Sequence, residues 1–375
     1  MNSRLLRHLD AAIAAASRPI QADCLRAERA ALLARQGEME EARGVISSLQ
    51  LQYAREPNPL VSAWIGLAEG LTSYFSNLSR ASRDKIQRSY ALSAAARDTR
   101  LHALAAAWLA HMAYTEYDFD AMARYSAESL RLAAPDHHGA RARVCLVVAL
   151  AYHFGGRFDG AQPWYGKARL HASAEGDEAM LSAIMYNMAG LLADQSRHAM
   201  MKGEPDAAVV RRAMLSLDTA HNLDTLIGLA SLDALVPLHR ARVFALQDQW
   251  AEAVALYDAH FSDGLLQGLD RMRASLGADL AWCRLQLGQV EQAAKEAAAA
   301  QIAVAHDRDV DDRAAAHSRL AQVFAALGQP EVASRHREQA GIDWRTHERD
   351  QRQAVASIEK ALASVQPQPA LSTGA

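Results

Sequence analysis

A unit of about 40 residues occurs twice in succession between Leu280 and Ala340. The text LAWCRLQLGQVEQAA, which begins at Leu280, corresponds to LAQVFAALGQPEVAS, which begins at Leu320, a displacement of 320 − 280 = 40 residues. Self-similarity at a fixed period of this size indicates a stacked-repeat architecture. One such unit cannot bury its apolar face alone, so we expect the units to stack on one another.

Each unit is predicted to contain two helices. The first carries a leucine-alanine pair and ends at Gly288, because glycine is favoured just past a helix C-terminus. The second begins near Val290 and places Ala293, Ala297 and Ala300 on one face. Small side chains at Ala281 and Ala293 would let the two helix backbones approach closely.

Comparable dipeptides mark eight units along the chain. They are Arg29-Ala30, Leu67-Ala68, Leu109-Ala110, Val148-Ala149, Met188-Ala189, Arg240-Ala241, Leu280-Ala281 and Leu320-Ala321. The alanines of these pairs lie 38, 42, 39, 40, 52, 40 and 40 residues apart. The fifth unit is about a dozen residues too long, and we expect the surplus in Ser196–Ala208, as an extended helix or a projecting loop. A projecting insertion in a repeat protein is often a binding element, and this alternative stays open.

The units resemble the tetratricopeptide repeat (TPR) family, whose consensus begins W-x2-L-G-x2-Y. Trp64-Ile-Gly-Leu67-Ala68-Glu-Gly-Leu71 is the best match. The chain departs from the family in its period, near 40 rather than 34, and in usually lacking the closing proline, and so looks like a bacterial variant found in regulatory proteins. The resemblance implies an all-α, right-handed superhelical solenoid of about eight antiparallel helix pairs with a C-terminal capping helix.

The expected domain organisation has four parts. Residues 1–18 form an N-terminal helix that Pro19 ends, and residues 19–341 form the repeat domain. Residues 342–365 are expected to be a capping helix, since Val355, Ile358 and Leu362 share one face. Residues 366–375 are expected to be a disordered tail.

Composition narrows the function classes. The chain has 375 residues, with 40 basic and 43 acidic side chains and a net charge of −3, so no basic excess favours nucleic acid as a partner. Three widely separated cysteines are typical of free thiols in a reducing compartment. No apolar run reaches the roughly 18 residues of a membrane span, and the N-terminus does not read as a signal peptide. We therefore expect a cytoplasmic protein.

Motifs for catalysis or metal binding are absent from the sequence. No H-E-x-x-H, Walker loop, G-x-G-x-x-G or G-x-S-x-G occurs, which favours a protein without enzymatic activity or cofactor. The acidic segment His306–Asp312 resembles the start of a calcium loop, but Asp312 and Ser318 replace the required glycine and glutamate, so it is interpreted as a helix-capping loop. His137-His138 lacks a third metal ligand at a suitable spacing.

The family resemblance also implies a binding groove. In tetratricopeptide proteins, positions two, five, nine and twelve of each unit line the concave surface. Carried onto this chain, that register gives His111, Tyr114, Arg143, His153, Tyr186, Arg242 and Trp282. Such side chains can stack on and hydrogen-bond to a bound peptide, and the histidines would add a pH dependence between about 5 and 8.

We therefore expect a non-enzymatic scaffold or adaptor that binds a protein or peptide partner in this groove. Two alternatives stay open. The first is a regulatory sensor module, whose groove binds a peptide or small signal and controls a partner regulator. The second is an enzyme with an unrecognised site. Homo-oligomerisation also stays open.

Overall fold

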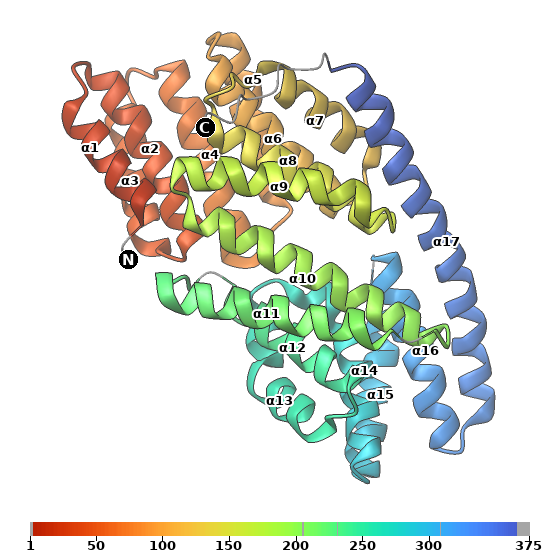
Figure 1. The fold of residues 1–375 in the computed structure, drawn as a ribbon. Helices are drawn as coiled ribbons and strands as arrows, with labels where there is room; N and C mark the ends of the chain where they lie inside the picture. Colours follow the sequence, from red (N-terminus) through yellow and green to blue (C-terminus); the bar gives the residue numbers. More distant parts are fainter. Residues whose placement is uncertain (1–2, 205, 231, 308, 366–375) are drawn as a thin grey trace.

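The computed structural model describes residues 3–204, 206–230, 232–307 and 309–365 and is built of helices (Figure 1). Seventeen α-helices and one 3₁₀ helix, with no β-strand, make up the regular structure of these ranges, which confirms the prediction of an all-α chain. The first nine are α1 (Arg4–Ala15), α2 (Pro19–Gln36), α3 (Met39–Gln52), α4 (Pro59–Asn77), α5 (Ala81–Ala95), α6 (Thr99–Thr115), α7 (Phe119–Leu132), α8 (His138–Phe154) and α9 (Phe158–Glu175). The remaining elements are α10 (Glu178–Met201), α11 (Ala207–Ile227), α12 (Leu235–Leu246), α13 (Trp250–Leu266), η1 (Leu269–Met272), α14 (Arg273–Gln286), α15 (Val290–Val304), α16 (Val310–Ala326) and α17 (Pro330–Ala363).

Glycines end the first helix of the repeated unit, as predicted. Gly288 follows α14 and Gly328 follows α16, with φ angles of 74° and 73°. This left-handed conformation is unfavourable for a residue with a Cβ and is common for glycine just after a helix. The N–H of Gly288 donates to the carbonyl of Leu285 at 3.0 Å, and that of Gly328 donates to Ala325 at 3.1 Å. The turn inside each unit is thus determined locally.

Each helix packs against its successor, and the even-numbered helices also pack against one another. Eight successive pairs run from α2 and α3 to α16 and α17, while α2, α4, α6, α8, α10, α12, α14 and α16 form one continuous row. Small residues allow these close crossings. Ala281 of α14 is fully buried in a cluster with Leu320 and Val323 of α16.

Longer helices take up the surplus of the fifth unit. Its helices α10 and α11 have 24 and 21 residues, whereas α14 and α15 of the seventh unit have 14 and 15. Of the two alternatives for Ser196–Ala208, the extended helix is correct for residues 196–201, which belong to α10. The next helix, α11, begins at Ala207. Pro205 lies outside the described residues.

The C-terminal helix differs from the predicted boundary at residues 341 and 342. α17 is one continuous helix of 34 residues, because Pro330 occupies its first turn and no proline follows inside it. Its first part packs on α16, and its second part leaves α16 to contact α7 and α8. The Gln351 amide donates to the carbonyl of Phe154 at 2.7 Å. Figure 1 shows α17 running along one side of the molecule past both of its halves. The predicted tail, residues 366–375, lies outside the described residues.

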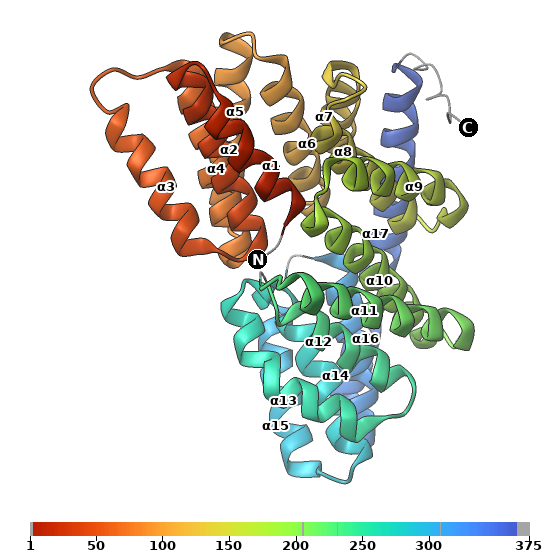
Figure 2. The same cartoon turned by 60° about the vertical axis from the view of Figure 1, so that its left-hand side comes forward.

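Contacts between distant segments bring the N-terminal half, α1–α9, against the C-terminal half, α10–α17 (Figure 2). The backbone N–H of Ala230 donates to the carbonyl of Gln36 at 3.3 Å. The Tyr117 hydroxyl, at the start of α7, donates to the carboxylate of Asp311 in α16. These two contacts join each end of the helical row to its middle, α2 to the segment before α12 and α16 to the segment before α7, and α17 adds contacts to α7 and α8. The inner row of helices therefore surrounds an interior space.

A buried network of charges fastens α10, α12, α14 and α16 together. Three arginines and three aspartates take part: Arg197, Arg242, Arg319, Asp194, Asp279 and Asp312. The formal charges cancel, and each guanidinium side chain is at most 3% exposed. Buried charges are tolerated only when they are paired and hydrogen-bonded, so this balance is a condition for the packing of the four helices.

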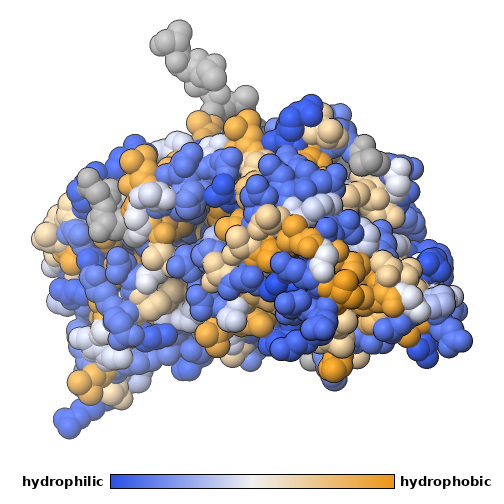
Figure 3. Space-filling view, turned by 90° about the horizontal axis from the view of Figure 1, so that it is seen from below, coloured by the Kyte–Doolittle hydropathy of each residue, from blue (hydrophilic) through white to orange (hydrophobic). Residues whose placement is uncertain are grey.

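The surface mixes polar and apolar residues. In the view of Figure 3, hydrophilic residues cover most of the face and hydrophobic ones are interspersed among them. The exposed large apolar side chains come from several helices, among them Leu51 of α3, Leu170 of α9 and Leu226 of α11. Within the described residues, no helix combines the length and the apolar character needed to span a bilayer.

Candidate ligand-binding cavity

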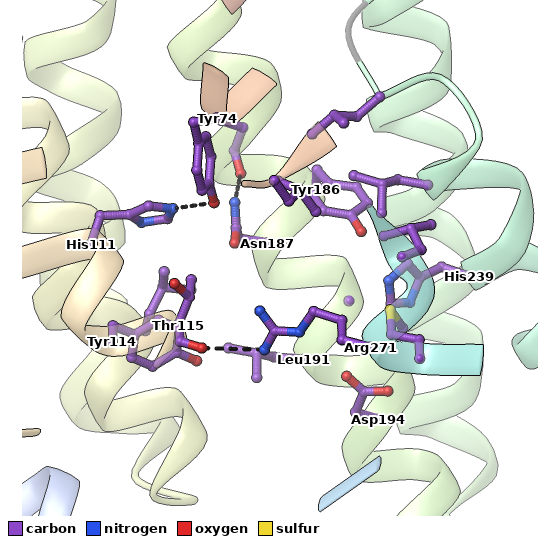
Figure 4. A pocket seen from close by; sticks show the side chains of 18 of the residues that line it. Tyr74, His111, Tyr114, Thr115, Tyr186, Asn187, Leu191, Asp194, His239 and Arg271 are labelled. Carbon is purple, nitrogen blue, oxygen red and sulfur yellow. Dashed lines mark hydrogen bonds between the residues drawn. The ribbon is translucent and has the colours of Figure 1, made fainter. Parts of the chain in front are cut away.

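A cavity of about 290 Å³ lies inside the helical row (Figure 4). Its wall is formed by α4, α6 and α8 of the N-terminal half and by α10, α12, η1 and the start of α16 of the C-terminal half. The two halves therefore share the cavity, and its shape depends on how they are held together.

One face of α10 forms the longest continuous part of the wall. The lining residues are spaced three and one apart in turn, as helical periodicity requires: Ala179, Ser182, Ala183, Tyr186, Asn187, Gly190, Leu191 and Asp194. From Ala179 to Asp194 is 194 − 179 = 15 residues, or about 22 Å of helix. At Gly190 the ring of His239 packs against the helix, and a Cβ there would lie 3.5 Å from its nearest atom, an ordinary van der Waals contact.

Aromatic rings make up the middle of the cavity. The Tyr74 hydroxyl and Nε2 of His111 share a hydrogen bond of 3.1 Å, drawn in Figure 4. Across the cavity, the rings of Tyr186 and His239 meet edge to face with centroids 5.5 Å apart. Burial lowers the pKa of both histidines to about 3, so they are neutral at physiological pH. Neutral rings of this kind suit the planar or apolar part of a ligand.

A charged corner closes the cavity between α6, η1 and α16. Arg271 pairs with Asp309 and also donates to the backbone carbonyl of Thr115 at 3.2 Å, which Figure 4 shows. Nearby, Asp194 accepts from Arg242 at 3.1 Å. Burial raises the pKa of Asp194 to about 6, although the positive charges of Arg242 and Arg197 act in the opposite direction. This corner binds the two halves to each other through charged hydrogen bonds.

Four of the seven residues predicted for the groove line this cavity: His111, Tyr114, Arg143 and Tyr186. They come from α6, α8 and α10, which are successive members of the inner row. The family register thus identified side chains that share one interior surface. Whether they bind a partner is a separate question of function.

The structure places the other three elsewhere. His153 is fully buried against the Tyr165 hydroxyl, 2.9 Å from its Nδ1. Arg242 belongs to the charge network, and Trp282 packs under the guanidinium of Arg319, 5.3 Å from its ring centroid. These side chains fill contacts between packed helices, α8 with α9 for His153 and neighbouring inner helices for Arg242 and Trp282, where a groove register assumes an open surface. None of the three lines the cavity.

The predicted pH dependence between 5 and 8 is also wrong for the two predicted histidines. Burial lowers the pKa of His111 to about 3 and that of His153 to about 4. Both side chains therefore stay neutral throughout that range. The pH response of this interior belongs to its carboxylates instead.

Several lining residues were missed from the sequence, among them Tyr74, Asp194, His239 and Arg271. Arg271 lies in η1, ahead of the helix that the register describes, and Tyr74 lies beyond the twelfth position of its unit. No local signal distinguishes them. Only the contact between the two halves brings them to the cavity.

The metal-site alternatives were rejected from the sequence, and the structure gives these residues other contacts. His137 Nε2 lies 2.9 Å from the carbonyl of Arg100, and His138 Nδ1 lies 3.0 Å from His171 Nδ1. Asp309 occupies the N-cap position of α16 but pairs with Arg271 and makes no capping bond through its side chain. Within the part of the chain that the structure describes, no group of three or more His, Cys, Asp or Glu residues is arranged to hold a metal ion.

Comparison with known proteins adds no relative. A scan against protein-family models found no match for this chain, and a search of curated proteins found none with significant similarity. The cavity and the contacts around it therefore carry the functional inference.

Proposed function

We propose that this protein is a non-enzymatic, ligand-binding module of the tetratricopeptide type, a right-handed superhelical solenoid whose inner helices surround a small-molecule site. The observation that supports this best is the cavity shared by the two halves and walled along one side by α10. Its size lies near the lower end of the roughly 300–1,000 Å³ typical of small-molecule sites, and its wall combines aromatic and aliphatic side chains with arginines and aspartates. Of the two alternatives derived from the sequence, such a protein corresponds to the regulatory sensor module.

A small molecule fits this site better than an extended peptide. An open groove would let a peptide pass along several units, but here Arg271 bonds to Thr115 across the space and Tyr117 bonds to Asp311. A peptide would have to break both contacts to enter. A small ligand can instead be enclosed, and enclosure of most of the ligand surface is characteristic of such sites.

Binding is favoured over catalysis by how the carboxylates are used. Asp312 is held by Arg197, Arg242 and Ser275 at 2.7 to 3.1 Å. Asp311 accepts from Tyr117. Both carboxylates hold helices together through Oδ1, so recruiting either as a general base would loosen contacts on which the packing depends. We propose that the readout is a change in the fit of the two halves, passed to a partner protein in the cytoplasm.

A cavity-filling variant tests the proposal. Ala183 lines the cavity on α10, so Ala183→Trp should occupy the space that a ligand needs. Ala91→Trp places the same ring on the exposed side of α5 and is the matched control. The protein is screened by thermal shift against a library of aromatic fragments, and hits are measured by calorimetry.

We expect hits whose Kd is the same for wild type and Ala91→Trp but at least tenfold weaker for Ala183→Trp, because the indole ring occupies the ligand's place. Folding of both variants is checked by circular dichroism. Hits that bind Ala183→Trp unchanged, or a library without any hit, would contradict the proposal.

A further inference from the structure

Arg143 of α8 is a buried cation on the cavity wall, and the described part of the chain provides it with no anionic partner. Its side chain is buried, with the residue 4% exposed, and its guanidinium carbon lies 3.8 Å from the ring centroid of Trp108. Among the residues that the structure describes, it makes no hydrogen bond and no ion pair, and its Nε is buried without a partner. Buried arginines are almost always paired, so this exception calls for a physical reason.

The neighbouring Arg141 shows what a structural arginine looks like in the same helix. It donates to the carbonyls of Ala133 and Ala134 at 2.6 and 2.7 Å and thereby caps the end of α7. Arg143 follows two residues later, which on a helix is roughly the opposite side, where it lines both the cavity and a smaller adjoining pocket that includes Trp108 and Asp177. The first arginine is thus fully used by the fold, whereas the second is presented to the interior space.

Asp177, the carboxylate whose charge acts on Arg143, is already engaged. Asp177 caps α10 by accepting from the N–H of Met180 at 2.9 Å, and it binds both terminal nitrogens of Arg35 at 2.8 and 2.9 Å. Burial and, to a smaller extent, the positive charge of Arg35 together lower the pKa of Arg143 to about 9, while Asp177 opposes this shift. The cation remains protonated at neutral pH, in surroundings that do not neutralise it.

We propose that Arg143 binds the carboxylate of a small aromatic ligand, whose ring lies among the aromatic side chains of the same cavity. A guanidinium matches a carboxylate with two parallel hydrogen bonds, and such charged bonds are strong inside a dry site. One uncompensated positive charge matches one negative charge. A phosphate dianion would leave excess charge near Asp177, so the monoanion is favoured.

This inference rests on the proposed function and is tested with matched probes. The probes are 4-phenylbutyrate, its neutral amide 4-phenylbutyramide, and phenyl phosphate, each titrated into the full-length protein by calorimetry. The first variant, Arg143→Met, has a side chain of similar volume without the charge. The second, Arg143→Lys, keeps the charge without the planar guanidinium that makes two parallel hydrogen bonds.

For wild type we expect the carboxylate to bind roughly ten- to a hundredfold more tightly than the amide, because a hydrogen bond to a charged group is lost in the amide. Arg143→Met should bind the two equally, at the amide's affinity, and Arg143→Lys should keep part of the preference. Equal binding of both probes to wild type would overturn the inference but leave the proposed function standing. Failure of all three probes to bind would overturn both, and a preference for phenyl phosphate would overturn the carboxylate assignment.

A second readout needs no ligand. Arg319 is the matched comparison, because it is also buried and also lies over a tryptophan ring but pairs with Asp279 at 3.0 Å. Removal of an unpaired buried charge should not lower the melting temperature, whereas removal of a paired one should. We expect Arg143→Met to melt at or above wild type and Arg319→Met to melt below it. If Arg143→Met melts as low as Arg319→Met, Arg143 is part of the fold and the inference fails.

Discussion

Removing Arg242 from the buried charge network should destabilise the protein strongly. The side chain is 1% exposed and binds Asp194 and Asp312 at 3.1 Å and Ser275 at 2.6 Å. In wild type three positive and three negative charges cancel. In Arg242→Met, two arginines face three aspartates in the interior. Removing one partner of a buried ion pair costs about 3–5 kcal/mol, because the other charge is left uncompensated.

The expected melting shift follows from the size of the chain. An unfolding entropy of about 2.1 cal/mol/K per residue over 375 residues is about 0.8 kcal/mol/K. A loss of 3–5 kcal/mol then lowers the melting temperature by about 4–6 °C, provided that the chain unfolds as one unit. Arg273→Met is the control, since Arg273 and Asp270 form an exposed pair with side chains 50% and 70% accessible. Its effect should stay within about 0.5 kcal/mol, less than 1 °C.

The loss should also depend on pH. Burial already raises the pKa of Asp194 to about 6, and the positive charge of Arg242 holds it down, so the variant raises it further. At pH values between the unfolded pKa of Asp194, near 3.9, and its higher folded pKa, the native state binds a proton that the unfolded chain does not. Stability of the variant must therefore fall as pH rises through that window. Urea unfolding at pH 5.5 and pH 8 should show the larger deficit at pH 8. A deficit equal to that of Arg273→Met, or one independent of pH, would refute this reasoning.

Two further predictions concern α17 and the buried histidine pairs. In Gly155→Ala the new Cβ would lie 2.2 Å from Cγ2 of Val355, so α17 must move, and urea unfolding should show a loss of about 1–3 kcal/mol of stability. Gly166→Ala is the control: its new Cβ would meet no atom within 4 Å, and the variant should gain about 0.5–1 kcal/mol. Equal effects of the two variants would show that α17 does not dock on α8. The Nδ1 atoms of His317 and His336 lie 2.8 Å apart. Burial lowers the pKa of both histidines, that of His336 to about 4. Below about pH 6.5 the unfolded chain therefore takes up protons at these residues that the native state excludes. Stability should fall between pH 6.5 and 4, and His317→Phe combined with His336→Leu should flatten that part of the profile; an unchanged slope would exclude the pair as its cause.

The helical repeat could be predicted because its signals are local. A glycine past a helix end and a leucine-alanine pair at a regular interval report on backbone and packing within one unit. The predicted boundary at 341 and 342 failed for the converse reason. The absence of a proline after Pro330 allows one continuous helix, but nothing within residues 330–363 reveals that Val355 docks beside Gly155, 200 residues earlier.

The cavity could be predicted only in part. The groove register identifies which side of each helix faces the interior of the row of even-numbered helices. It correctly assigned Arg143 and Tyr186 to that interior surface. The same register misplaced Arg242, because it cannot tell an open groove from a crossing filled by a neighbouring helix. The acidic segment before α16 was interpreted as a capping loop, yet Asp311 reaches Tyr117, 194 residues away in the chain. A hydrogen bond between residues so far apart in the chain leaves no trace in one sequence.

The two kinds of buried charge in this protein have opposite consequences. In the network around Asp312 every charge has a counterpart, so the network resists any separation of α10, α12, α14 and α16. Among the residues that the structure describes Arg143 has no counterpart, so its buried charge is one that the carboxylate of a ligand would pair with. A ligand bound there would stabilise the native state by RT ln(1 + [L]/Kd), about 2.7 kcal/mol at a hundredfold excess over Kd. Because α6, α8 and α10 all contribute to that site, this free energy acts on the contact between the two halves, which is where a signal to a partner would have to arise.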